Sequence, residues 1–150
     1  QLPHAQLRVV GPGSRKLRSI LPVRASIGGT VDDVDSEYRR AWFAVSPTSV
    51  AAGAPYKVLS ALAAERPVVV RSPGYVGLPV ASEIGVSMAT TAETFANELV
   101  RLATDAVAYE SAVALGLEYL KRFHSIDAVM PLLLDSYARL GASDGNGSGL

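Results

Sequence analysis

The first segment of the chain that could do chemistry is a glycine turn directly after a short apolar run. The turn contains Gly11, Gly13, Ser14 and Arg15. A glycine turn after a strand lets backbone N–H groups approach a phosphate closely, and a helix that follows adds the positive end of its dipole. The spacing matches neither GxGxxG nor the GK[ST] ending of a phosphate-binding loop. An anion site and a plain strand-to-helix turn are therefore equally supported at this position.

A second candidate is a loop of small residues that leads into a helix entered through Pro55. Proline suits the first turn of a helix because its missing N–H has no partner there. Lys57 falls in that first turn, where a solvated cation opposes the helix dipole at a cost of about 0.3–1 kcal/mol. With an anionic ligand bound at the helix N-terminus, the charge of Lys57 would be stabilising instead of costly. For a single lysine, an ordinary surface position is the better-supported interpretation, and only the pattern around Lys57 favours an anion site.

The acidic residues, histidines and serines do not form a catalytic set. Asp32 and Asp33 precede a predicted helix at 34–41, and capping of that helix explains them more simply than a metal site does. His124 is expected to cap a helix or lie on the surface, and no GxSxG elbow is present. The chain has no cysteine, which excludes a disulfide, a thiolate metal site and a cysteine nucleophile. We predict no catalytic side chain, no metal and no cofactor.

Short apolar runs alternate with helical patterns along the whole chain. Strands are predicted at 7–10, 25–28, 42–45, 67–70 and 85–89. Helices are predicted at 34–41, after Pro55, after a Thr90/Glu93 capping box, at 109–123 and at about 125–140, the last with a kink at Pro131. The buried stripe of the helix after Pro55 is predicted to contain Val58, Leu59, Leu62 and Ala63.

This alternation predicts a Rossmann-like α/β fold with three layers, in which the C-terminal helices pack on a mainly parallel sheet. We expect one domain at residues 1–141 and a disordered tail at 142–150, which is rich in Gly, Ser, Asn and Asp. In such a sheet, ligands bind beyond the carboxyl ends of the strands. The loops at 11–15, 29–33 and 47–57 are therefore the expected site.

Composition narrows the classes of protein further. Of the 150 residues, 49% are hydrophobic and 19% are charged, which is typical of a globular domain and not of a disordered chain. The 14 basic and 14 acidic residues cancel, so a nucleic-acid partner is not expected. No apolar run approaches the roughly 20 residues of a membrane span. We expect a soluble, cytoplasmic protein.

One longer stretch resembles a known family. The segment GAPYKVLSALAAERPVV, preceded by AVSPTS and followed by RSPGYVGL, is similar to the donor-binding region of GT-B-fold glycosyltransferases. The closest group is the large family of retaining enzymes of the "glycosyl transferases group 1" type. Upstream, LRVVGPG and IGGTVDDVDSEYRRAWFAVSP resemble its strand-plus-glycine turn and its Gly-x-Val-x-Asp segment. Downstream, ETFANELVRLATD and FHSIDAVMPLLLDSYARL resemble its closing helices, so the resemblance extends from Leu7 to Leu140.

The resemblance implies the C-terminal, nucleotide-sugar-binding half of an enzyme that transfers a sugar, with retention, from a nucleoside diphosphate donor. In this family the segment at Val31 contacts the base, the Gly11–Gly13 turn lies near the diphosphate, and the helix N-terminus at Lys57 faces the diphosphate and sugar. The donor-binding residues implied in this sequence are Gly11, Gly13, Ser14, Arg15, Val31, Asp32, Asp33, Gly53, Ala54, Pro55, Tyr56, Lys57 and Ser60.

The sequence also departs from the family pattern. The family usually carries two glutamates around the helix after the loop, where this chain has Ala52 and Ser60, and Ser60 could offer the ribose at most one hydrogen bond. The family's Arg–Lys clamp and its N-terminal acceptor-binding domain correspond to no part of this chain. The isolated chain is therefore expected to transfer no sugar, and any membrane association is expected through the missing half alone.

Two other interpretations stay open at this point. One is a non-catalytic α/β binding module that has lost the donor site, which Ala52 and Ser60 favour. The other is a flavodoxin-like regulatory domain. Against it, this sequence lacks the acidic cluster expected at the strand ends of such a domain. The base, sugar and acceptor are not indicated by the sequence.

Overall fold

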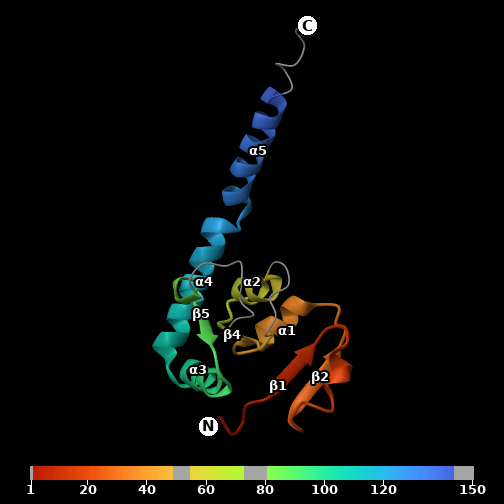
Figure 1. Cartoon of the computed structure of the whole chain (residues 1–150). Coiled ribbons are helices and arrows are strands. Elements are labelled where there is room, and N and C mark those ends of the chain that lie inside the picture. The colour runs from red at the N-terminus through yellow and green to blue at the C-terminus, as the bar shows by residue number, and fades with distance from the viewer. Residues whose placement is uncertain (1, 49–54, 73–80, 144–150) are drawn as a thin grey trace.

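The computed structural model describes residues 2–48, 55–72 and 81–143 (Figure 1). It contains strands β1 (Leu7–Val10), β2 (Ala25–Gly29), β3 (Ala44–Ser46), β4 (Val68–Arg71) and β5 (Val86–Ala89). Its α-helices are α1 (Val34–Arg40), α2 (Tyr56–Ala63), α3 (Ala92–Thr104), α4 (Ala106–Phe123) and α5 (Ile126–Ser143). The short 3-10 helix η1 (Ser14–Leu17) follows β1, and a second one, η2 (Ala81–Ile84), precedes β5. The predicted alternation of strands and helices is confirmed.

The strands form two separate parallel sheets. One pairs β1 with β2, and the other has the order β3-β4-β5 with β4 in the centre. In the larger sheet, Val68 lies opposite Ala44 on one side and Val86 on the other. The predicted α/β fold with parallel strands is confirmed, and the division between β1 and β3 is a feature that the sequence does not indicate.

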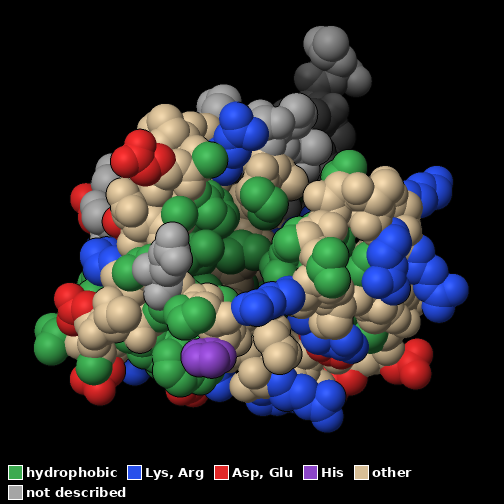
Figure 2. Space-filling model, turned by 90° about the horizontal axis from the view of Figure 1, so that it is seen from below, with side chains coloured by type: hydrophobic (Ala, Val, Ile, Leu, Met, Phe, Trp, Pro, Cys, Tyr) green, Lys and Arg blue, Asp and Glu red, His purple; other side chains and the backbone are tan. Residues whose placement is uncertain are grey.

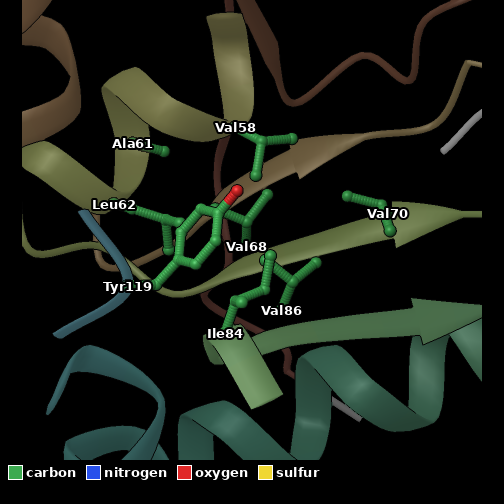
Figure 3. Close-up of a cluster of buried hydrophobic side chains, with 8 residues drawn as sticks. All are labelled: Val58, Ala61, Leu62, Val68, Val70, Ile84, Val86 and Tyr119. Atoms are coloured by element: carbon green, nitrogen blue, oxygen red, sulfur yellow. The ribbon is translucent and has the colours of Figure 1, made fainter. Parts of the chain in front are cut away.

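The core lies around β4, whose three valines are at most 2% exposed. Val68 and Val70 face α2, where Val58 and Leu62 point toward them and the ring of Tyr119 from α4 closes the cluster (Figure 3). On the other face of the strand, Val69 packs against side chains of α3 and α4, among them Leu102 and Ala112. Helices on both faces explain why β4 is apolar at successive positions.

Two details of the predicted helices are corrected by the structure. In α2 the small residue on the buried face is Ala61, which is fully buried, whereas Ala63 is exposed. The cap of α3 is Thr91 paired with Thr94, not Thr90 with Glu93: the Thr94 N–H donates to Thr91 Oγ1 at 3.1 Å, and the Thr91 N–H donates to Thr94 Oγ1 at 3.0 Å. A threonine hydroxyl thus replaces the carboxylate that a capping box usually carries.

The last helix behaves differently from the other C-terminal helices. As expected, α3 and α4 pack on the larger sheet, but α5 projects from the body of the molecule (Figure 1). Its apolar side chains are exposed, Leu132 at 70% and Tyr137 at 64%, so the prediction that it packs on the sheet is wrong. The helix includes Pro131 and continues to Ser143, which makes the first two residues of the predicted tail helical. The remaining tail residues, 144–150, lie outside the described part of the chain.

A membrane-spanning helix is not found. No helix among the described residues combines the length and apolar character that a span requires.

Candidate functional site

A hollow of about 430 Å³ opens at the carboxyl ends of β1 and β2. Parallel strands that end at one edge bring the loops after them together, and here the turn after β1 meets the turn after β2. The Gly11 N–H donates to the Gly29 carbonyl at 2.6 Å and ties the two turns to each other. The hollow is lined by Gly11, Gly13, Ser14, Arg15, Lys16, Gly29 and Thr30.

Glycine is required at two points of this wall. Gly13 is the N-terminal cap of η1 and has φ +80°, a left-handed conformation that costs other residues about 1–2 kcal/mol. Gly29 has φ +69° and lies under the guanidinium of Arg15, so that an added Cβ would be 3.3 Å from Arg15 Nε. The glycines thus let η1 begin immediately after β1 and let Arg15 lie across the end of β2.

The hydroxyl of Ser14 is the unusual polar group of the hollow. Ser14 is 4% exposed, and its Oγ has no hydrogen-bond partner among the residues that the structure describes. A buried hydroxyl without a partner costs about 1–3 kcal/mol. Ser14 is among the residues that line the hollow, but its Oγ has less than 1 Å² of accessible surface, so a ligand group could bond to it only after the side chain rotates toward the hollow.

The hollow is also basic. Arg15 and Lys16 lie on η1 and Arg18 directly after it, and no acidic residue occupies the first turn. A second hollow of about 370 Å³, lined by Arg15, Arg18 and Ile27, lies beside the first. Within the described residues, Arg15, Lys16 and Arg18 form no ion pair. Arg15, Lys16 and Arg18 thus make the hollow suitable for an anion, and Lys and Arg side chains also lie on the opposite side of the part that contains β1 and β2, at the right of Figure 2.

The acidic residues predicted to contact a nucleotide base lie outside this lining. Asp33 caps α1 by accepting a hydrogen bond from the Ser36 N–H at 2.9 Å, and it lies 3.7 Å from Arg39. Its carboxylate is therefore already used by the fold, as the capping interpretation anticipates. Asp32 is exposed and Val31 is half-buried, both on the segment that joins β2 to α1.

The N-terminus of α2 forms a separate part of the predicted site. Pro55 is its N-cap residue, and no side chain caps it. Tyr56 and Lys57 are exposed, and Ser60 is half-buried. The Lys57 carbonyl accepts a hydrogen bond from the hydroxyl of Tyr38 at 3.2 Å, which links α2 to α1.

The predicted residues therefore fall into two groups. The structure brings Gly11, Gly13, Ser14 and Arg15 together around one hollow, and it does not place Lys57 in that lining. Gly53 and Ala54 lie outside the described residues, as does Ala52.

The sequence analysis did not name Lys16, Gly29 and Thr30 among the donor-binding residues, although Gly29 and Thr30 lie in the predicted loop 29–33. The signal that could have found Gly29 is the Gly28–Gly29 pair that ends β2, because a glycine after a strand allows the positive φ of a tight turn. Lys16 carries no such local signal, since its place in the lining depends on the contact between two loops.

The acidic residues and histidines that the structure describes do not form a metal site. Within residues 2–48, 55–72 and 81–143, no three His, Asp or Glu side chains lie together as metal ligands would. His124 ends α4, and its Nε2 lies 3.0 Å from the hydroxyl of Tyr119. This agrees with the capping role expected for His124.

One family model matches most of the chain. The model of the family described as "Glycosyl transferases group 1" matches residues 1–105, a segment that includes both parts of the site. No curated protein sequence matches the chain.

Crystal structures of the Anabaena protein Alr3699/HepE are similar in fold. The complex of that protein with UDP-glucose has a TM-score of 0.72 at 14% identity, covering 91% of this chain and 42% of HepE. The complex with UDP and glucose has a TM-score of 0.71 at 15% identity, with 91% and 41% covered. This chain therefore spans less than half the length of HepE and shares the Rossmann-like fold of that structure.

Proposed function

Because this chain belongs to the glycosyl transferases group 1 family, we propose that it binds the nucleotide-sugar donor of a glycosyltransferase in the hollow at the ends of β1 and β2. The observation that carries the proposal is the buried, unpartnered hydroxyl of Ser14 in a wall that also presents Arg15 and Lys16. An anion with several acceptor oxygens matches both features. HepE, which has the same fold, was crystallised with UDP-glucose and with UDP, and this supports a nucleoside diphosphate as the bound group.

The proposed roles follow from the chemistry of each side chain. Arg15 presents a planar fork of donors that matches phosphate oxygens, and Lys16 adds a second positive charge. In the glycine turn, the N–H groups of Gly11 and Ser14 already donate to the carbonyls of Gly29 and Gly11, so the proposed donors to the ligand are the N–H of Gly13 and the hydroxyl of Ser14. These donors stabilise the negative charge that develops on the departing nucleoside diphosphate as the glycosidic bond breaks.

The second group of residues completes the proposed donor site. The segment with Val31 and Asp32 is the proposed contact for the base, and the N-terminus of α2, with Lys57, is the proposed contact for the diphosphate and sugar. The acceptor, a second domain and retention of configuration belong to the same proposal. The proposal assigns the clamp residues and the acceptor site to a part of the enzyme other than these 150 residues, so we expect this chain to bind donor without transferring sugar.

The test is a titration of the chain with UDP and UDP-glucose by calorimetry, with amide chemical shifts as the structural readout. We expect shifts grouped in residues 11–16, in residues 29–32 and at the N-terminus of α2 around Lys57. Arg15→Ala should weaken UDP binding about tenfold or more, because a charged hydrogen bond is worth about 1.5–3 kcal/mol. Arg24→Ala is the matched control, since Arg24 lies in the same part of the chain but lines neither hollow.

Ser14→Ala gives a sharper signature, because two quantities should move in opposite directions. Loss of the buried hydroxyl should stabilise the free protein or leave its stability unchanged, because no hydrogen bond is lost. The same change should weaken UDP binding. Equal weakening by Arg15→Ala and Arg24→Ala, or unchanged UDP binding by Ser14→Ala, would contradict the proposal.

A specific observation favours one other function. Ser60 lies on α2 where the resemblance implies a glutamate, and it is half-buried, so a non-catalytic module that has lost the donor site is the second candidate. A folded chain that binds neither UDP nor UDP-glucose would support that candidate.

A further inference from the structure

The charges of this chain are distributed unevenly, and the nucleotide site does not explain the distribution. Residues 1–31 contain five of the 14 basic residues and none of the 14 acidic residues. The rest of the chain is therefore net acidic, although the whole chain is neutral. A charge asymmetry of this kind indicates a charged partner, such as a nucleic acid or a membrane surface.

Part of the positive charge lies away from the hollow, in residues 17–24, which we call the basic loop. This loop leads from the end of η1 to the start of β2, so it reaches the edge of the smaller sheet opposite the hollow. Arg18 and Arg24 are exposed, and neither forms an ion pair among the described residues. Arg24 donates a hydrogen bond to the Pro3 carbonyl, which leaves its charge unpaired. Figure 2, seen from below, shows Lys and Arg side chains at the right, over the part that contains β1 and β2.

Apolar side chains of the same loop extend into solvent beside these charges. Leu17 is 38% exposed, Ile20 is 76% exposed and Val23 is 103% exposed. Single exposed apolar side chains are common on protein surfaces. Three of them in one short loop that also presents two guanidinium groups form a surface that is apolar and basic together.

The backbone holds these side chains in place. The Leu17 carbonyl accepts hydrogen bonds from the N–H groups of Ile20 and Leu21, at 3.0 and 3.1 Å. The Pro22 carbonyl accepts one from the Ala25 N–H at 2.8 Å, directly before β2. Because the loop is already ordered, contact with a partner costs less conformational entropy than it would for a free segment.

We propose that the basic loop rests on a membrane surface that contains anionic lipids. Ile20 and Val23 enter the headgroup region, while Arg18 and Arg24 contact lipid phosphates. Apolar insertion and attraction to anionic lipids act together in peripheral contacts of this kind, and each basic residue near the surface adds about fivefold in affinity. The proposal differs from the expectation that membrane association occurs through the missing half alone.

The apolar side chains distinguish a membrane from a nucleic acid. Proteins that bind single-stranded nucleic acids combine a basic groove with aromatic side chains on which bases stack. The first aromatic residue of this chain is Tyr38, so the basic loop offers no such platform. Phosphate neutralisation supplies the affinity for a duplex, and it has no use for aliphatic side chains such as Ile20 and Val23.

The test is sedimentation of the chain with two kinds of vesicle, phosphatidylcholine alone and two parts phosphatidylcholine to one part phosphatidylglycerol. We expect binding to the anionic vesicles alone. Binding should weaken in about 1 M salt, where the Debye length is about 3 Å instead of about 10 Å at 0.1 M. Ile20→Ser with Val23→Ser should lower the partition coefficient at least tenfold because less apolar area leaves water, and Arg24→Gln should lower it about fivefold.

Each variant has a matched control elsewhere on the surface. Ile126→Ser with Val107→Ser changes the same two residue types, at side chains that are 78% and 77% exposed on α5 and α4. Lys121→Gln removes one exposed positive charge from α4. Neither control should change binding to the anionic vesicles.

Absence of binding to the anionic vesicles, or an equal loss in the control variants, would overturn the proposal. It would also be overturned if the chain bound a DNA duplex in place of the vesicles, and Ile20→Ser with Val23→Ser left that binding unchanged, because the partner would then be a nucleic acid. Ile20, Val23 and Arg24 line neither hollow. These variants should therefore bind UDP as the native chain does, and either proposal can fail without the other.

Discussion

Replacement of Gly85 by alanine should destabilise the protein because two separate penalties meet at this position. Gly85 lies between η2 and β5 with φ +69°, and an added Cβ would be 2.0 Å from the carbonyl oxygen of Ala112 on α4. The left-handed conformation costs alanine about 1–2 kcal/mol. The clash is with backbone, so α4 must move, and overpacking of this kind costs about 1–3 kcal/mol. The free energy of unfolding should therefore fall by about 2–5 kcal/mol.

Gly13→Ala is the matched control, since it carries only the first penalty. Gly13 has φ +80°, but nothing lies within 4 Å of the Cβ that alanine would add. Its cost should be about 1–2 kcal/mol. Urea denaturation followed by far-ultraviolet circular dichroism measures both variants. If Gly85→Ala and Gly13→Ala lowered the free energy of unfolding equally, the close packing of α4 on Gly85 would be refuted.

Two further pairs of variants, each a test and its control, probe local features of the fold. Thr91→Ala should cost about 1 kcal/mol of stability because it removes the cap of α3, whereas Thr90→Ala should leave the urea midpoint unchanged; the reverse ranking would restore the cap predicted from the sequence. The hydrogen bonds from Arg8 hold the pKa of Glu37 below its ordinary value of 4.5, so the ionised carboxylate favours folding above that pH and the effect is lost as the pH falls through the lowered pKa. Stability measured from pH 6 to pH 3 should therefore fall less in Glu37→Gln than in the native chain, and Asp35→Asn, which removes a carboxylate without an ion pair, should not show this difference.

Elements with a strong local signal could be predicted from the sequence. The run Val68–Val70 predicts a central parallel strand, and β4 is that strand. Pro55 predicts the start of α2, which begins one residue later. The turn after β1 predicts part of the hollow. Gly11 and Gly13 both have positive φ, which glycine adopts readily in a tight turn.

Features that depend on contacts between distant segments could not be predicted. The position of Arg15 over Gly29 requires that β1 and β2 end at the same edge. The choice of Ala61 over Ala63 for the buried face of α2 depends on where β4 lies beneath it. The apolar pattern of α5 predicts a buried face wherever a partner exists, but the pattern does not say whether that partner is the sheet.

The two groups of proposed donor-binding residues lie on different sheets, and this has a physical consequence for ligand binding. Ser14 and Arg15 belong to the smaller sheet, while Lys57 belongs to α2 on the larger one. Among the described residues, the main links between these parts are the Arg8–Glu37 pair and the hydrogen bond from Tyr38 to the Lys57 carbonyl, both through α1. Because a preorganised site loses less conformational entropy when a ligand binds, these links should matter for an anion that contacts both groups of donors. Glu37→Gln, which removes the ion pair with Arg8, should weaken the binding of such an anion and leave unchanged the binding of one that contacts Ser14 and Arg15 alone.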